Sequence, residues 1–182
     1  MSESCFNCGT LGDHEVAELT CSGARPAGVA DILFALCGNS IEDPSDGTQW
    51  TTAINGGFAK EVFNVAAGID SADPTLSPKI TACGTPTTLY VTYTGSITDY
   101  NFTSENFDFW TSLINGYKIP QMLMRMCTKS GWDDECMWLD GEISFTGSPV
   151  VPNTDEEAAR FEITFTFKGD LSLVPTPAGI FD

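Results

Sequence analysis

Apolar and polar residues alternate most strictly in the stretch from Arg160 to Lys168, near the end of the chain. Four large apolar side chains take every second position and four polar ones fill the gaps: Phe161, Ile163, Phe165 and Phe167 against Glu162, Thr164, Thr166 and Lys168. Successive side chains of a β-strand point to opposite faces, so this stretch predicts a strand with one buried and one polar face. The buried face requires a second sheet or a helix, and the polar face meets water or another subunit.

Five other segments carry strand patterns. An apolar run from Ala27 to Gly38, flanked by Pro26 and Asn39, favours a buried strand over a helix. The segment 117–127 is apolar on both faces, which is typical of a central strand. The remaining predicted strands are 58–66, 87–99 and 136–146, with a bulge or bend expected at Gly95 and at Gly141.

Two segments predict helices. Asp46 can cap a short helix over Thr48–Ile54, whose inner face holds Trp50, Ala53 and Ile54. Ser104 can cap a second helix over residues 105–114, which ends at Asn115 and Gly116. The aromatic and aliphatic side chains of this second helix are expected to pin it onto a sheet: Phe107, Trp110, Leu113 and Ile114.

The remaining segments divide the chain into an arm, a domain and a tail. Residues 1–26 predict an irregular, cysteine-rich N-terminal arm, and residues 27–170 predict one mainly β sandwich or barrel with a helix docked near 104–115. Residues 171–182, which include Pro175 and Pro177, predict an extended tail that cannot join a central strand. Loops are expected over 68–78, 130–135 and 147–157.

The charge of the chain is strongly negative, with 8 Lys+Arg against 25 Asp+Glu and a net charge of −17. This balance argues against binding to a nucleic-acid backbone, which requires clustered cations. It is compatible with simple solubility, or with a surface along which DNA moves without sticking. No apolar run approaches the length of a membrane span, and we expect neither a membrane segment nor a signal peptide.

The chain has seven cysteines, and we expect reduced thiols in a cytoplasmic compartment. Cys5, Cys8, His14 and Cys21 have a spacing close to that of a zinc knuckle without matching it, so zinc binding, free thiols and a Cys–Cys bridge all stay open. Farther along the chain, Cys127 and Cys136 are expected to lie near each other across a hairpin as free thiols.

No motif for phosphate binding, dinucleotide binding, serine hydrolysis or zinc proteolysis is present. His14 is the only histidine, so any histidine base would have to come from the arm. We therefore expect a protein that is not an enzyme, with no catalytic, cofactor-binding or metal-binding residues to assign.

Three features together resemble the tail tube (major tail) proteins of long-tailed bacteriophages. They are the run Ala27–Cys37 followed by a Trp50-centred helix and Gly56-Gly57, the segment Phe107–Leu113 ahead of paired strands, and the closing strand Phe161–Phe167 with its proline-bearing tail. The resemblance covers most of the chain, but not the cysteine-rich first 21 residues.

The resemblance implies a virion structural protein, made in the host cytoplasm, that assembles into hexameric rings. The rings would stack into a tube together with other phage tail proteins, and an acidic lumen would let DNA pass without specific binding. The alternatives are another virion component, such as a head decoration or connector protein, or a β-sandwich ligand-binding module. A zinc-dependent binding protein built on the N-terminal cysteines is a further alternative.

Overall fold

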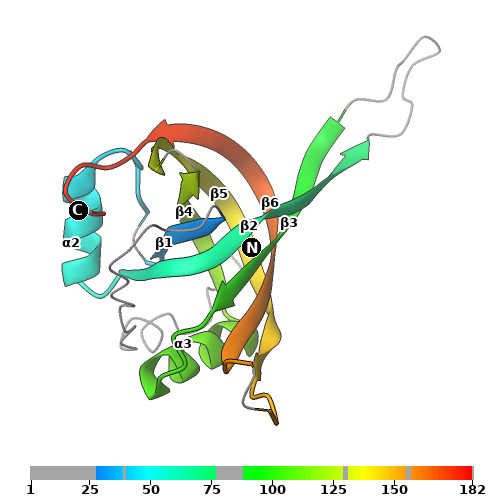
Figure 1. Cartoon of the computed structure of the whole chain (residues 1–182). Helices are drawn as coiled ribbons and strands as arrows, with labels where there is room; N and C mark the ends of the chain where they lie inside the picture. The colour runs from blue at the N-terminus through cyan, green and yellow to red at the C-terminus, as the bar shows by residue number, and fades with distance from the viewer. Residues whose placement is uncertain (1–27, 39, 77–87, 129–130, 155–156, 182) are drawn as a thin grey trace.

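The strands form a closed antiparallel barrel. A computed structural model describes residues 28–38, 40–76, 88–128, 131–154 and 157–181. In order around the barrel, each strand hydrogen-bonded to the next, the strands are β1 (Val29–Ala35), β2 (Ala59–Leu76), β3 (Thr88–Asp99), β6 (Arg160–Pro175), β5 (Gly131–Val150) and β4 (Lys118–Thr128). Two helices, α2 (Gly47–Asn55) and α3 (Ser104–Ile114), pack outside this barrel (Figure 1). The expected fold class, mainly β with a docked helix, is confirmed.

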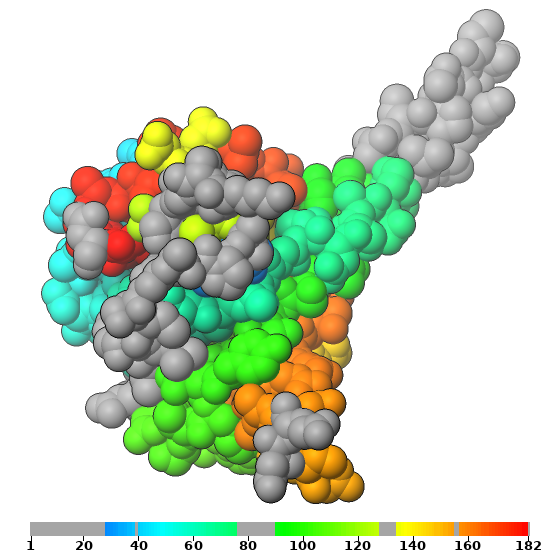
Figure 2. Space-filling model, in the orientation of Figure 1, coloured from blue at the N-terminus to red at the C-terminus, as the bar shows by residue number. Residues whose placement is uncertain are grey.

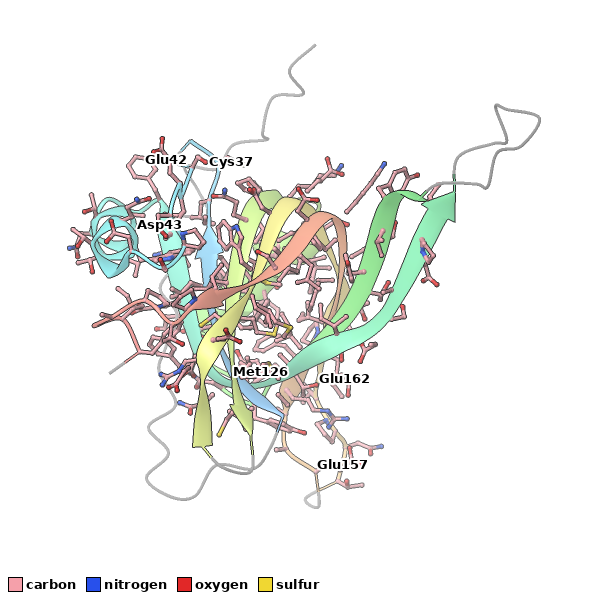
Figure 3. The ribbon with its side chains drawn as sticks, turned by 90° about the horizontal axis from the view of Figure 1, so that it is seen from above. Cys37, Glu42, Asp43, Met126, Glu157 and Glu162 are labelled. Carbon is pink, nitrogen blue, oxygen red and sulfur yellow. The ribbon has the colours of Figure 1, made fainter. Side chains whose placement is uncertain are left out.

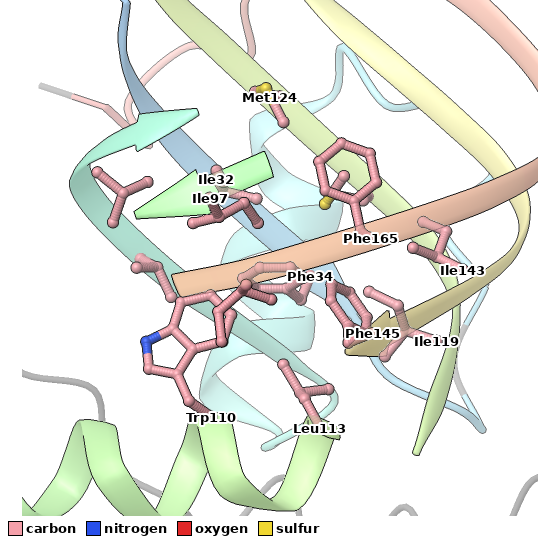
Figure 4. Close-up of a cluster of buried hydrophobic side chains, with 14 of the residues drawn as sticks. Ile32, Phe34, Ile97, Trp110, Leu113, Ile119, Met124, Ile143, Phe145 and Phe165 are labelled. Atoms are coloured by element: carbon pink, nitrogen blue, oxygen red, sulfur yellow. The ribbon is translucent and has the colours of Figure 1, made fainter. Parts of the chain in front are cut away.

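The alternating stretch of β6 supplies the centre of the barrel core. Phe161, Ile163, Phe165 and Phe167 are buried, whereas the four polar residues between and after them are exposed, as the sequence predicts. Each of the remaining strands also contributes apolar side chains, which pack against the phenylalanines inside the barrel. Among them are Phe34, Ile97, Met124 and Phe145 (Figure 4). Full burial of each such side chain contributes about 1.5–3 kcal/mol.

Strand β1 is apolar apart from Asp31, because both of its faces are covered. The buried Asp31 carboxylate accepts a hydrogen bond from the Asn64 N–H at 2.9 Å. Ile32 and Phe34 point into the barrel, and Leu33 and Ala35 point outward. The outward residues join a second group, here called the outer cluster, which holds α2 against the barrel: Leu33, Ala35, Ile41, Trp50, Ala53, Ala59, Leu123, Cys136 and Trp138. As predicted, Asp46 caps α2, accepting a hydrogen bond from the Thr48 N–H at 2.8 Å.

Helix α3 closes the lower end of the barrel in Figure 1 with Phe109, Trp110 and Leu113, all fully buried. Two details differ from the sequence prediction. The N-cap is Thr103, which accepts a hydrogen bond from the Asn106 N–H, while Ser104 is the first helical residue. Phe107 is 40% exposed, since Phe109 takes the inward position expected for it.

Several predicted loops are strand. Residues 68–76 continue β2, because they pair with β3 as far as Leu76 and Thr88. Strand β5 begins at Gly131 and continues to Val150, which shortens the expected loops at 130–135 and 147–157. Strand β6 continues to Pro175 through its ladder with β5, where the sequence predicts a separate tail from residue 171.

The last residues of the tail fold back onto this chain. Ile180 and Phe181 pack against the outer cluster, and the Arg125 guanidinium lies 5.3 Å from the centre of the Phe181 ring. Arg125 Nη1 also donates a hydrogen bond to the Phe181 carbonyl at 3.2 Å. The tail therefore helps cover the outer side of β4 and β5, next to α2.

Gly95 is required by the packing of the core. It lies opposite Phe165 in the β3–β6 ladder, and a Cβ atom there would overlap the Phe165 ring and the Gly68 carbonyl. The expected irregularity is present in the partner strand, where the β2–β3 register shifts between Ile69 and Ser71.

We predict that Gly95→Ala lowers the free energy of unfolding by roughly 1–3 kcal/mol, because the added methyl group overpacks the core. The matched control is Gly68→Ala on the adjacent strand, where a Cβ atom meets no heavy atom within 4 Å. The control variant should stay within about 0.5 kcal/mol of the parent protein. Chemical denaturation followed by tryptophan fluorescence measures both variants, and equal effects would contradict this account of Gly95.

Candidate assembly surface

One face of the barrel, formed by β3, β6 and β5, carries mostly small polar side chains. The outward residues of β3, β6 and β5 align in four cross-strand rows of three: Thr98, Glu162 and Ser148; Ser96, Thr164 and Thr146; Thr94, Thr166 and Ser144; Thr92, Lys168 and Glu142. Nine of these twelve side chains carry a hydroxyl group. We call this array the hydroxyl face.

The few charges on the hydroxyl face are paired locally. Lys118 Nζ lies 2.7 Å from Glu142 Oε1, and Arg160 Nε lies 2.8 Å from Glu162 Oε1. Glu157 also reaches Arg160, and it lies near the same end of β6 as Glu162 (Figure 3). Exposed ion pairs of this kind add little stability, but they cancel the field of each carboxylate at short range. The hydroxyl face therefore carries little of the net charge of −17.

No described element covers the hydroxyl face, whereas other sides of the barrel are covered. Helix α2 and the tail lie over β1, β4 and part of β5, and α3 lies over one end (Figure 1). In the space-filling view, β6 reaches the surface beside the green strand β3 (Figure 2). The face has neither the clustered cations of a nucleic-acid site nor the concave apolar lining of a small-molecule site.

The sequence identified one strand of this face and missed the other two. The exposed positions of β6 follow from its alternation, and they are exposed in the structure. The matching hydroxyl residues of β3 and β5 also alternate in the sequence, but their side-by-side placement depends on a register between distant segments. That register is fixed by the buried partners of the same strands, such as Ile97 against Ile163 and Phe145 against Phe165.

The residues considered for zinc binding lie outside the described residues: Cys5, Cys8, His14 and Cys21. Within residues 28–38, 40–76, 88–128, 131–154 and 157–181, no three His, Cys, Asp or Glu side chains gather as a metal site would require. Cys127 and Cys136 are both buried, but they do not face each other across the β4–β5 ladder, because Cys136 pairs with Arg125 and Cys127 pairs with Trp132.

Asp99 is the most unusual charged group in the core. It is 1% exposed, and its carboxylate accepts hydrogen bonds of 2.8 Å from the Asn101 N–H, Asn106 Nδ2 and Trp110 Nε1. Burial raises the pKa of the Asp99 carboxyl above its ordinary value of 3.8, and the three hydrogen bonds oppose this shift. These bonds fix α3 to the end of β3, which indicates a structural role rather than catalysis.

Comparisons with known proteins give a distant likeness only. No protein-family model matches this chain, and no curated protein sequence does. The structure of Hcp1 from Salmonella typhimurium is 12% identical, with 80% of this chain and 92% of that chain covered and a TM-score of 0.36. A second structure, titled Hcp protein, is 13% identical, with 83% and 99% covered and a TM-score of 0.35. Overlap at this level identifies neither a family nor a function.

Neither described helix has the length and apolar character needed to cross a membrane.

We predict that the contribution of Asp99 to the stability of the protein decreases as the pH rises, opposite to the usual behaviour of a hydrogen-bonded carboxylate. Because its pKa is raised in the folded state, the native protein holds this proton more tightly than the unfolded chain does. The stability that Asp99 contributes is therefore full below its ordinary pKa and is lost as the pH rises through the folded pKa. The free energy of unfolding of the parent protein minus that of Asp99→Asn should fall as the pH increases from about 4 to 8.

The control for this measurement is Asp108→Asn, an exposed position on α3 that changes the net charge equally. Urea denaturation at each pH gives both differences. A difference that grows with pH for Asp99→Asn would show that the hydrogen bonds outweigh burial at this carboxyl.

Proposed function

We propose that this chain is a structural subunit that assembles into hexameric rings, and that the rings stack into the DNA-conducting tail tube of a bacteriophage. In this proposal the partners are further copies of the chain and other tail proteins, and the mature location is the virion. The role is mechanical and requires neither a catalytic group nor a cofactor.

The hydroxyl face is the observation that carries the proposal. This broad sheet face is left uncovered by the described elements, while the opposite side is covered by α2 and the tail. A ring of subunits that turn this face inward would have a channel wall made mainly of hydroxyl groups. Such a wall lacks the clustered cations that bind a polyanion. The exposed Tyr90 ring at its edge is occupied by Lys168, whose Nζ lies 3.8 Å from the ring centre.

The proposed channel differs from the sequence expectation in its charge. The resemblance to tail tube proteins implies an acidic lumen, but the hydroxyl face has two carboxylates and one ammonium group, and each carboxylate has a basic partner. In this proposal, DNA passes because nothing holds it, and repulsion comes from the acidic groups elsewhere on the ring.

The assembly itself is the first test. Negative-stain electron microscopy of the purified full chain at increasing concentration should show rings with a central hole, and stacks of rings. A particle that stays monomeric at the highest concentration, by microscopy and by light scattering, would contradict the tube.

The inward orientation of the hydroxyl face is tested by labelling. In assembled tubes, Thr164→Cys should react with a small maleimide but lose reactivity toward a bulky polymer-linked maleimide, which cannot pass through a narrow channel. The control is Thr51→Cys on the exposed side of α2, which should react with both reagents before and after assembly. Labelling of the unsubstituted protein gives the background from its seven native cysteines. Full polymer labelling of Thr164→Cys in tubes would place the face outside.

A further inference from the structure

The ladder between β3 and β6 stops while both strands continue. Its last pair is Thr92 with Lys168. Beyond this pair, the backbone of β3 pairs only with β2 as far as Thr88, and the backbone of β6 pairs only with β5 as far as Pro175. At the start of the gap, Lys168 Nζ lies 3.8 Å from the centre of the Tyr90 ring. Figure 1 shows the two strands separating, with β2 and β3 projecting as an arm to the upper right and β6 curving to the upper left. Among the described residues, each strand therefore presents an unpaired backbone edge to the gap between them.

Two prolines reveal which backbone groups face this gap. Pro149 lies opposite Phe161 in the β5–β6 ladder, and Pro74 lies opposite Val91 in the β2–β3 ladder. Proline has no N–H, so both positions are non-hydrogen-bonded pairs, and the N–H and C=O groups of Phe161 and Val91 point the other way. The β5–β6 register has no shift, so the same direction recurs at every second residue of β6: Gly169, Leu171 and Leu173.

The two edges that face the gap, one on β3 and one on β6, differ in residue type from the outer edge of β2. The outer edge of β2 carries Asp70, Asp73 and Pro74, and charges and prolines are what edge strands use to resist pairing with another chain. Beside the gap, β3 offers Val91, and β6 offers Leu171 and Leu173, with Leu173 64% exposed. The arm is thus protected against pairing on one edge and open to it on the other.

The gap does not close within one chain because β6 is held elsewhere. Val174 packs against the outer cluster, and the Thr176 N–H donates to the Asp134 carbonyl at 2.9 Å. These contacts draw the end of β6 toward α2, away from the arm. A two-stranded arm without further partners is marginally stable in water. The edge of β3 is therefore open to a further strand, which the described part of this chain does not supply.

We propose that the β3 edge of one copy pairs with the β6 edge of a neighbouring copy, continuing across the subunit boundary the register that stops within the chain. Val91 would then lie opposite Gly169 of the neighbouring copy, and Tyr90 opposite its Asp170. Every chain carries both edges, which are antiparallel and compatible in register. Because the two edges are different surfaces, the contact is head-to-tail, and repetition closes a ring or extends a filament. This inference rests on the proposed function, and it identifies the contact between neighbouring subunits of the proposed ring.

Backbone pairing at this edge is tested by a proline substitution. Leu171→Pro removes an N–H that points into the gap, where the proposed register places it opposite Leu89 of the neighbouring copy. The substitution leaves the β5 ladder intact, so the protein should still fold. We expect the concentration for half-assembly to rise by about tenfold or more, as lost edge hydrogen bonds are repeated at every contact. Leu171→Thr keeps the N–H and should assemble far closer to the parent protein. Val91→Pro tests the opposite edge and should match Leu171→Pro, with circular dichroism verifying the fold of each.

The register is tested by crosslinking. Positions 90 and 170 would form a non-hydrogen-bonded pair, whose Cα atoms lie about 4.5 Å apart, within disulfide range. Tyr90→Cys and Asp170→Cys chains, mixed and oxidised, should give a crosslinked dimer that neither variant nor the unsubstituted protein gives alone.

Three results overturn the inference, and they separate it from the proposed function. Leu171→Pro rings that form as readily as the parent rings reject this contact but leave the tube standing. An intrachain disulfide in a monomeric Tyr90→Cys, Asp170→Cys double variant shows that the gap closes on itself. A parent protein that never assembles rejects the tube and this contact together.

Discussion

The close approach of β3 and β6 around the Phe165 ring is the constraint on which the rest of the structure depends. Phe165 fills the centre of the barrel only because its cross-strand neighbour is Gly95, where any side chain would collide with the ring. This contact sets the register of β3 against β6, and the register in turn places Ile97 opposite Ile163 and Tyr93 opposite Phe167. Once the cross-strand partners of the inward-facing residues are fixed, the cross-strand partners of the outward-facing residues on the same strands are fixed as well. The polar rows of the hydroxyl face are therefore a consequence of how the core is packed.

The two ends of the barrel differ: a helix covers the lower end, and no described helix covers the upper end. At the lower end, β3 leads directly into α3, and the buried Asp99 carboxylate binds the helix through Asn106 and Trp110, so the core is sealed. At the upper end, no described helix covers the opening, and β3 and β6 separate with unpaired edges. A barrel normally removes the edge-strand problem by closing on itself. Here closure is complete over the length of the phenylalanine row and ends where that row ends, at Phe167 and Lys168.

Sequence reasoning succeeded where the signal was local. The alternation of β6, the Asp46 cap of α2 and the end of α3 at Asn115 all depend on residues within a few positions of one another. It was wrong over residues 68–76, whose glycine, aspartates and proline are loop residues by composition, because Pro74 faces an edge where no hydrogen bond is needed. It also ended β6 too early, since Leu171–Pro175 are strand through pairing with β5 alone. The hydroxyl face was visible on one strand only, because its remaining rows require the register between strands far apart in the chain.

The difference between core strands and edge strands explains why the segment 68–76, predicted as a loop, says most about how the chain could assemble. A core strand is specified by its own apolar residues, whereas an edge strand is specified by what is allowed to approach it. The Asp70, Asp73 and Pro74 residues that suggested a loop are well suited to an edge that must remain unpaired. The adjacent β3 segment has no such residues on the gap side, where Val91 presents its backbone groups. Within one arm, the chain therefore distinguishes an edge that excludes a neighbour from an edge that accepts one, and this asymmetry is what a directional, head-to-tail assembly requires.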